Sequence, residues 1–258
     1  MNRRRFLSLF IKGTAGALLA KEAREIFKLP EAGASSPKPV RWGFLVDTYS
    51  CIGCGFCVKA CKLENEIPFE ANVSRTWVER YVVTKDGRVF VDTPQEARNG
   101  FTTGRLELGA GKFQEIRNEN IQKAFFVPKL CNQCENPPCV QVCPVGATYQ
   151  TADGISLVDR KWCIGCGYCI MACPYGMRFF HPVHKVADKC NFCYHRIAKG
   201  LKPACVQACP TQARRIGNLK DPKDPVAQVV LSQRVGVHKP EYGTKPQVYF
   251  LGLSEEVR

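Results

Sequence analysis

The sequence predicts an α+β fold made of two interleaved modules of one design, related by a pseudo-two-fold axis, with a β-rich insertion. Three observations lead to this expectation. The sixteen cysteines fall into four groups of four, and each group closes with the spacing C-x3-C. The first and last groups enclose the two central ones, so one module is expected to lie inside the other. Between the groups lie stretches rich in β-branched and aromatic residues, which favour strands.

The two central groups carry the clearest pattern. They read C-x2-C-x4-C-x3-C-P and C-x2-C-x2-C-x3-C-P, with Cys131, Cys134, Cys139 and Cys143 in the first and Cys163, Cys166, Cys169 and Cys173 in the second. This is the pattern of bacterial ferredoxins, in which the fourth cysteine ligates the other cluster of a two-cluster module. Three thiolates in a short loop can bind one face of an iron–sulfur cube, whereas the fourth points away. The two halves therefore supply fourth ligands to each other.

The two outer groups are variations on this pattern. The first reads C-x2-C-x2-C-x3-C at Cys51, Cys54, Cys57 and Cys61, with Lys62 where the other groups have proline. The last reads C-x2-C-x11-C-x3-C-P at Cys190, Cys193, Cys205 and Cys209, so its third thiolate comes from further along the chain. Both keep the spacing of the final pair, and we interpret both as ligand loops.

We expect these cysteines to form four sites, each holding one [4Fe–4S] cluster. The central groups exchange their fourth cysteines as in one ferredoxin, and the outer groups then pair by elimination. Site A contains Cys51, Cys54, Cys57 and Cys209, and site B contains Cys131, Cys134, Cys139 and Cys173. Site C contains Cys163, Cys166, Cys169 and Cys143, and site D contains Cys190, Cys193, Cys205 and Cys61.

The predicted organisation follows from this pairing. Residues 35–66 and 181–220 form the outer ferredoxin-like module, and residues 129–180 form the inner one. Residues 67–128 are an insertion with a β-hairpin, residues 221–258 a C-terminal tail and residues 1–34 a signal region. We expect strands at residues 42–46, 77–83, 89–91, 124–127, 155–158 and 247–251, and a helix at residues 226–235. The glycine-rich residues 100–112 are interpreted as an exposed docking loop.

The composition disfavours several other classes of protein. Four cubes with their thiolates would add about −8 to the formal charge of +14, so the basic residues largely offset the clusters and we expect no nucleic-acid binding. A disulfide framework or zinc sites remain as alternatives, but cysteines in tight triplets suit a shared metal centre better. We interpret the four histidines as packing or surface residues, and Trp162 and Tyr168 as packing against the clusters.

The N-terminus resembles an export signal. Arg3, Arg4, Phe6 and Leu7 match the twin-arginine pattern R-R-x-F-L, and the apolar stretch that follows is too short to span a bilayer well. A basic amphipathic surface helix is the alternative. The twin-arginine route carries folded proteins, which suits clusters inserted in the cytoplasm. We therefore expect the protein in the periplasm or at the outer face of the cytoplasmic membrane.

Taken together, the motifs resemble those of the four-cluster iron–sulfur subunits of the dimethyl sulfoxide reductase superfamily, especially the tetrathionate, polysulfide and formate-dependent nitrite reductase types. The resemblance covers residues 42–253 and rests on CIGCGFCVKACKLEN, LCNQCENPPCVQVCPVGA, CIGCGYCIMACPYGMRF, ADKCNFC and LKPACVQACP. In some relatives a tryptophan replaces one cysteine, whereas all sixteen are present here. The long segment 70–122 departs from shorter members.

The resemblance implies an electron-transfer subunit rather than a self-sufficient catalyst. Its expected partners are a catalytic subunit that carries molybdopterin and a membrane subunit that reacts with quinone, and some relatives work with multihaem cytochromes instead. The alternative hypothesis is a free periplasmic polyferredoxin carrier without a fixed complex.

Overall fold

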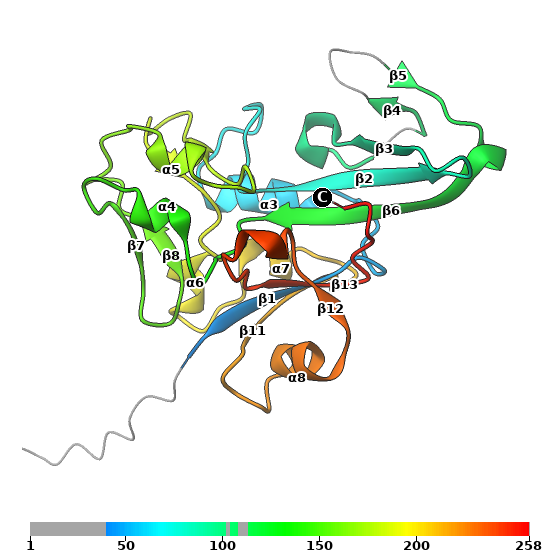
Figure 1. Cartoon of the computed structure of the whole chain (residues 1–258). Coiled ribbons are helices and arrows are strands. Elements are labelled where there is room, and N and C mark those ends of the chain that lie inside the picture. The colour runs from blue at the N-terminus through cyan, green and yellow to red at the C-terminus, as the bar shows by residue number, and fades with distance from the viewer. Residues whose placement is uncertain (1–39, 102–103, 108–112, 258) are drawn as a thin grey trace, which may run out of the picture. The chain divides into compact units, whose positions relative to one another are not determined.

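The structure is a computed structural model that describes residues 40–101, 104–107 and 113–257 (Figure 1). The signal residues Arg3, Arg4, Phe6 and Leu7 lie outside the described residues, so the export signal stays a prediction. Part of the predicted docking loop, residues 102–103 and 108–112, also lies outside them. No helix in the described ranges combines the length and apolar character that a membrane crossing requires.

A four-stranded sheet joins the start of the described residues to their end. Its order is β11 (Arg214–Asn218), β1 (Trp42–Asp47), β13 (Val248–Leu251) and β12 (Val235–Gly236). β1 runs antiparallel to β11 and parallel to β13. The strands predicted at residues 42–46 and 247–251 are confirmed, while β11 was not predicted. Through β11, this sheet positions the segment that follows Cys209.

A three-stranded sheet forms the predicted insertion. Its order is β3 (Val89–Asp92), β2 (Thr76–Thr84) and β6 (Ile121–Leu130), and Figure 1 shows β2 and β6 as two long strands side by side. The predicted hairpin of residues 77–83 and 89–91 is confirmed. The strand predicted at residues 124–127 is longer and runs directly into Cys131. A small pair, β4 (Leu106–Glu107) with β5 (Phe113–Gln114), extends this region.

The cysteine groups lie on short helices and small strand pairs. β7 (Thr148–Gln150) pairs with β8 (Ser156–Val158), and β9 (Phe179–Phe180) pairs with β10 (Ala187–Asp188). The helices are α3 (Phe56–Glu64), α4 (Pro138–Gln141), α5 (Tyr168–Met171), α6 (Tyr194–Ile197) and α7 (Ala204–Gln207). α3 packs against α7, and α4 packs against α5. These two contacts bring the first cysteine group beside the last, and the second beside the third.

Proline explains why three of these helices are short. α4, α5 and α7 stop before Cys-Pro, because proline disfavours helical backbone at the residue before it. In the first group Lys62 replaces proline, and α3 continues to Glu64. The Lys62 side chain is buried and donates to the carbonyl oxygens of Ala71 and Val73, at 2.5 and 2.9 Å, and pairs with Glu96 at 3.0 Å. Lys62 therefore links α3 to residues of the insertion by hydrogen bonds and an ion pair.

The C-terminal helix is shorter than predicted. α8 spans Pro225–Ser232 rather than residues 226–235, and the Asp224 side chain caps it by accepting from the Val226 N–H at 2.8 Å. The backbone is extended at Gln233, and Val235 pairs with Leu251 in the sheet. The prediction of a longer helix was wrong because the edge of the sheet takes up these residues as β12.

Candidate iron–sulfur sites

The four C-x2-C loops that open the cysteine groups share one backbone feature. Their third residue has left-handed backbone: φ is 68° at Gly53, 45° at Gln133, 72° at Gly165 and 53° at Phe192. A residue with a Cβ pays roughly 1–2 kcal/mol for this conformation. The loop geometry therefore recurs even where Gln133 and Phe192 make it costly, as expected when the turn must aim two thiols at one centre.

A second glycine in the two C-x2-C-x2-C loops offers a matched test. Gly55 and Gly167 both have left-handed backbone, with φ of 76° and 78°. A Cβ at Gly55 would lie 2.1 Å from the Ala97 carbonyl oxygen, whereas one at Gly167 would lie 3.2 Å from the Phe180 ring. We expect Gly167→Ala to destabilise the protein by about 1–2 kcal/mol and Gly55→Ala clearly more, because backbone at Ala97 cannot move aside as a ring can. Equal shifts of the two midpoints in urea unfolding would contradict this.

The structure brings the four predicted cysteines of site A together. Cys51, Cys54, Cys57 and Cys209 line one cavity, although Cys209 lies far along the chain from the other three. Arg214 lines the same cavity. Burial raises the pKa of Cys51 to about 11, and the Gly53 N–H and the Arg214 guanidinium oppose that rise.

Site B has the same construction. Cys131, Cys134, Cys139 and Cys173 line one cavity, together with Arg178 and the two prolines that precede Cys139. Burial raises the pKa of Cys134 to about 12. Arg178 is buried and its Nη2 donates to the Cys139 sulfur at 3.0 Å.

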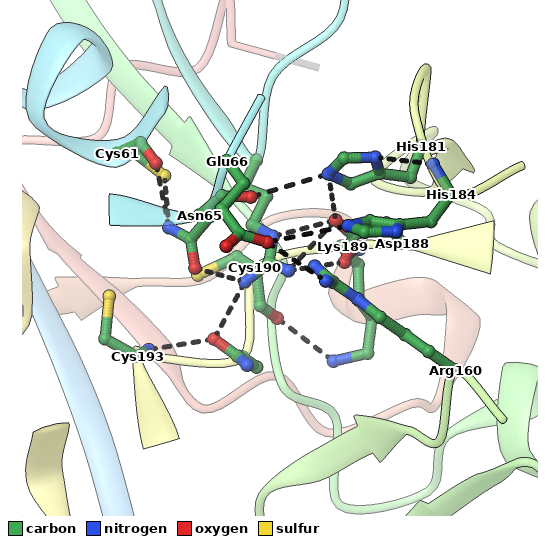
Figure 2. Close-up of polar contacts among 12 residues, drawn as sticks. Cys61, Asn65, Glu66, Arg160, His181, His184, Asp188, Lys189, Cys190 and Cys193 are labelled. Atoms are coloured by element: carbon green, nitrogen blue, oxygen red, sulfur yellow. Dashed lines mark hydrogen bonds and ion pairs between the residues drawn. The ribbon is translucent and has the colours of Figure 1, made fainter. Parts of the chain in front are cut away.

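The cysteines predicted for site D also lie close together. Burial raises the pKa of Cys61 well above its ordinary value, and the charges of Cys190, Cys205 and Cys193 add to this effect. The Asn65 Nδ2 lies 3.5 Å from the Cys61 sulfur and donates to the Cys61 carbonyl oxygen at 2.8 Å (Figure 2).

Site C is the most exposed of the predicted sites. Cys163 and Cys169 pack in one small apolar cluster with Cys139, while Cys166 is exposed. Burial acts to raise the pKa of Cys143, but N–H groups of residues 145, 147 and 148 donate to its sulfur and hold the pKa below its ordinary value. The packing of α4 on α5 carries Cys143 toward this group. That Cys143 completes site C stays a prediction.

Two interpretations of aromatic and histidine residues have different outcomes. Trp162 and Tyr168 are 66% and 54% exposed, so neither is buried by the protein itself, and their packing against clusters stays a prediction. His181 and His238 are buried and His184 and His195 are partly exposed, which agrees with packing and surface roles.

The donor set at these sites suits a multinuclear iron–sulfur centre. The cavities of sites A and B are lined by four thiols each and by no carboxylate or imidazole. All sixteen thiols are free of disulfides. Among the described residues, no three Cys, His, Asp or Glu side chains lie close enough to share a single ion. A cube needs wider spacing, because its four thiolates bind four different iron atoms.

Comparison with known proteins identifies the family. Two family models, both described as a 4Fe-4S dicluster domain, match residues 50–147 and residues 122–219. The B subunit of tetrathionate reductase from Salmonella typhimurium is 41% identical over 257 residues, which cover 98% of this chain and 89% of that protein. This protein belongs to the iron–sulfur B subunits of the dimethyl sulfoxide reductase family.

Two further relatives cover most of the sequence. Protein NrfC of Escherichia coli is 36% identical over 96% of this chain and 94% of its own length. The B subunit of polysulfide reductase from Wolinella succinogenes is 36% identical over 82% of this chain and 94% of its own length. The protein is therefore an iron–sulfur electron-transfer subunit of a reductase complex.

Two residues of this iron–sulfur subunit were not predicted from its sequence. Arg178 and Arg214 line the cavities of sites B and A, yet neither was singled out. The sequence did carry a signal, because each lies five residues after the Cys of a Cys-Pro pair, Cys173 and Cys209. The Nη1 and Nη2 atoms of Arg214 are buried and find no hydrogen-bond partner among the described residues. A cluster in the adjoining cavity would supply the missing acceptors, so the residues fit the group.

Proposed function

We propose that this iron–sulfur subunit holds four [4Fe–4S] clusters at sites A to D and relays single electrons through them. Each bound cluster supplies a one-electron couple, and the protein supplies thiolates, burial and positioning. Buried thiols with raised pKa values hold their protons until a metal displaces them, so cluster binding releases protons. The observation that carries the proposal is a four-cysteine cavity at each of sites A and B, completed by a distant cysteine.

The order of the sites along the relay follows from their shared elements. α3 carries Cys57 of site A and Cys61 of site D. The charge of Cys131 of site B acts on the buried Cys190 of site D, so sites D and B are neighbours. α5 carries Cys169 of site C and ends before Cys173 of site B. These links support a row in the order A, D, B, C.

The two ends of this row suit two partners. Exposed apolar side chains flank the cysteines at both ends: Tyr49, Ile52 and Phe56 near site A, and Trp162, Ile164 and Met171 near site C. Exposed apolar groups around a redox centre favour docking of another protein. We propose a catalytic subunit that carries molybdopterin at one end and a membrane subunit that reacts with quinone at the other, on the outer side of the cytoplasmic membrane after twin-arginine export. The relatives' names, as B subunits of reductases, support such a complex.

Anaerobic purification from native membranes tests the proposal. Four cubes contain about sixteen iron and sixteen sulfide per chain, and a molybdenum-containing subunit should copurify. Protease added to intact spheroplasts should reach the complex. About sixteen iron per chain without any copurifying partner would instead support a free carrier or a donor of electrons to a multihaem cytochrome. A content of about four irons or fewer per chain, the equivalent of one cube, would contradict the four-cluster relay.

A further inference from the structure

The buried cations of this protein fall into two kinds. Within the described residues, four buried Lys or Arg side chains each pair with a carboxylate at 2.8–3.4 Å; the pairs are Lys62–Glu96, Arg75–Asp188, Arg98–Glu70 and Lys129–Glu79. Three other buried cations, Arg178, Lys189 and Arg214, have no carboxylate within ion-pair distance in the described part of the chain. A buried charge without a counter-ion is costly, so these three need another source of negative charge.

Arg214 lies between sites A and D. It is 1% exposed and lines the cavity of site A. Burial acts to lower the pKa of Arg214, but thiolates of both sites hold it above its ordinary value. They are Cys57 and Cys51 from site A, and Cys205 and Cys61 from site D. β11 begins at Arg214, so the sheet fixes its backbone.

Arg178 occupies the equivalent position between sites B and C. It lines the cavity of site B, donates to the Cys139 sulfur and is acted on by thiolates of both sites, Cys131 of B and Cys169 of C. Its Nη1 donates to the Thr148 hydroxyl at 3.3 Å. Both arginines follow their Cys-Pro pair at the same distance, as expected for equivalent positions in two modules of one design.

Lys189 lies at the remaining junction, between sites D and B. Its Nζ donates to the carbonyl oxygen of Cys190, a site D residue, at 3.0 Å (Figure 2). It also donates at 2.6 Å to the carbonyl oxygen of Ser156, which lines the cavity of site B. The Lys189 charge acts on Cys139 of site B. Each junction in the row therefore holds one buried cation.

We propose that Arg178, Lys189 and Arg214 are positioning residues that set the reduction potentials of the two clusters on either side of them. A fixed positive charge favours the reduced form of a cluster, because reduction adds negative charge nearby. One cation shared by two clusters raises both potentials together and so keeps neighbours matched for electron transfer. The inference rests on the proposed function, since only bound clusters have potentials to shift.

Redox titration of the whole complex, followed by electron paramagnetic resonance, tests this proposal. Arg214→Gln is expected to lower the equilibrium constant for reducing the clusters at sites A and D by on the order of tenfold. For a one-electron couple, this lowers the reduction potential by about 59 mV. Arg178→Gln should lower the potentials of a different pair, at sites B and C. Arg214→Lys and Arg178→Lys keep the positive charge, so their reduction potentials should differ from the wild-type values by less than a third of that shift.

The matched control is Arg215→Gln, which removes the same charge from the next residue of β11. Arg215 is partly exposed and lies 3.9 Å from Asp47, so its removal should leave all four potentials almost unchanged. Unchanged potentials in fully loaded Gln variants would overturn the proposal, as would an equal shift of all four clusters. If a Gln variant loses iron, the loaded Lys variant decides: wild-type potentials support the proposal, and lowered ones overturn it. The iron content of the wild-type protein tests the four-cluster relay itself. The relay and the proposed role of the buried cations can therefore fail separately.

Discussion

Replacing Cys209 with serine is expected to remove or convert the cluster at site A and to leave the inner module loaded. Cys209 lines the same cavity as Cys51, Cys54 and Cys57, and serine is a poor ligand for iron in this setting. Iron should fall by up to about four atoms per chain, and the signal of one cluster should change in electron paramagnetic resonance. The loss should break the relay while the partner subunits still fold.

Double variants show which cysteines share a site. Adding Cys51→Ser to Cys209→Ser should cost no further cluster, because both residues belong to site A. Adding Cys131→Ser instead should cost a second cluster, since Cys131 lines the separate cavity of site B. Residues that act as a unit are non-additive, whereas distant sites add. The opposite pattern, additive for Cys51 and non-additive for Cys131, would refute the nested pairing.

Cysteine spacing made most of the candidate sites predictable. Three thiols within one loop are a local property, so Cys51, Cys54 and Cys57 could be grouped without knowing the fold. The repeated pattern then implied where each fourth ligand lies, and the structure places Cys209 beside the first group. The strands at residues 42–46 and 77–83 were also predictable, because their apolar runs are local.

Features that depend on distant segments were not predictable in the same way. β11 exists because Arg214–Asn218 pairs with β1, far back in the chain, and the buried place of Arg214 depends on that pairing. The role of Lys62 depends on Glu96 and on two carbonyl groups of the insertion. The end of α8 depends on the free edge of β13. In each case tertiary contacts decide what the local sequence leaves open.

The Arg75–Asp188 pair supports site D from a distance. Both side chains are buried, and the Arg75 guanidinium donates to Asp188 Oδ2 through Nε and Nη2, at 3.1 and 2.9 Å. Its Nη1 donates to Asn65 Oδ1 at 2.5 Å and to Asn191 Oδ1 at 3.2 Å. Asn65 in turn contacts Cys61, and Asn191 accepts from the Cys193 N–H at 3.0 Å. The pair thus orients two amides that each contact a site D cysteine.

Asp188→Asn should therefore destabilise the protein strongly and weaken site D first. Removing one partner of a buried ion pair leaves an uncompensated charge and costs about 3–5 kcal/mol. Urea unfolding of the anaerobic, loaded protein measures this loss, and iron should leave site D before the other clusters are affected. Asp86→Asn is the matched control, because the Asp86–Arg88 pair is exposed and contacts no cysteine. A midpoint shift in Asp188→Asn no larger than in that control would show that the buried pair does not hold site D in place.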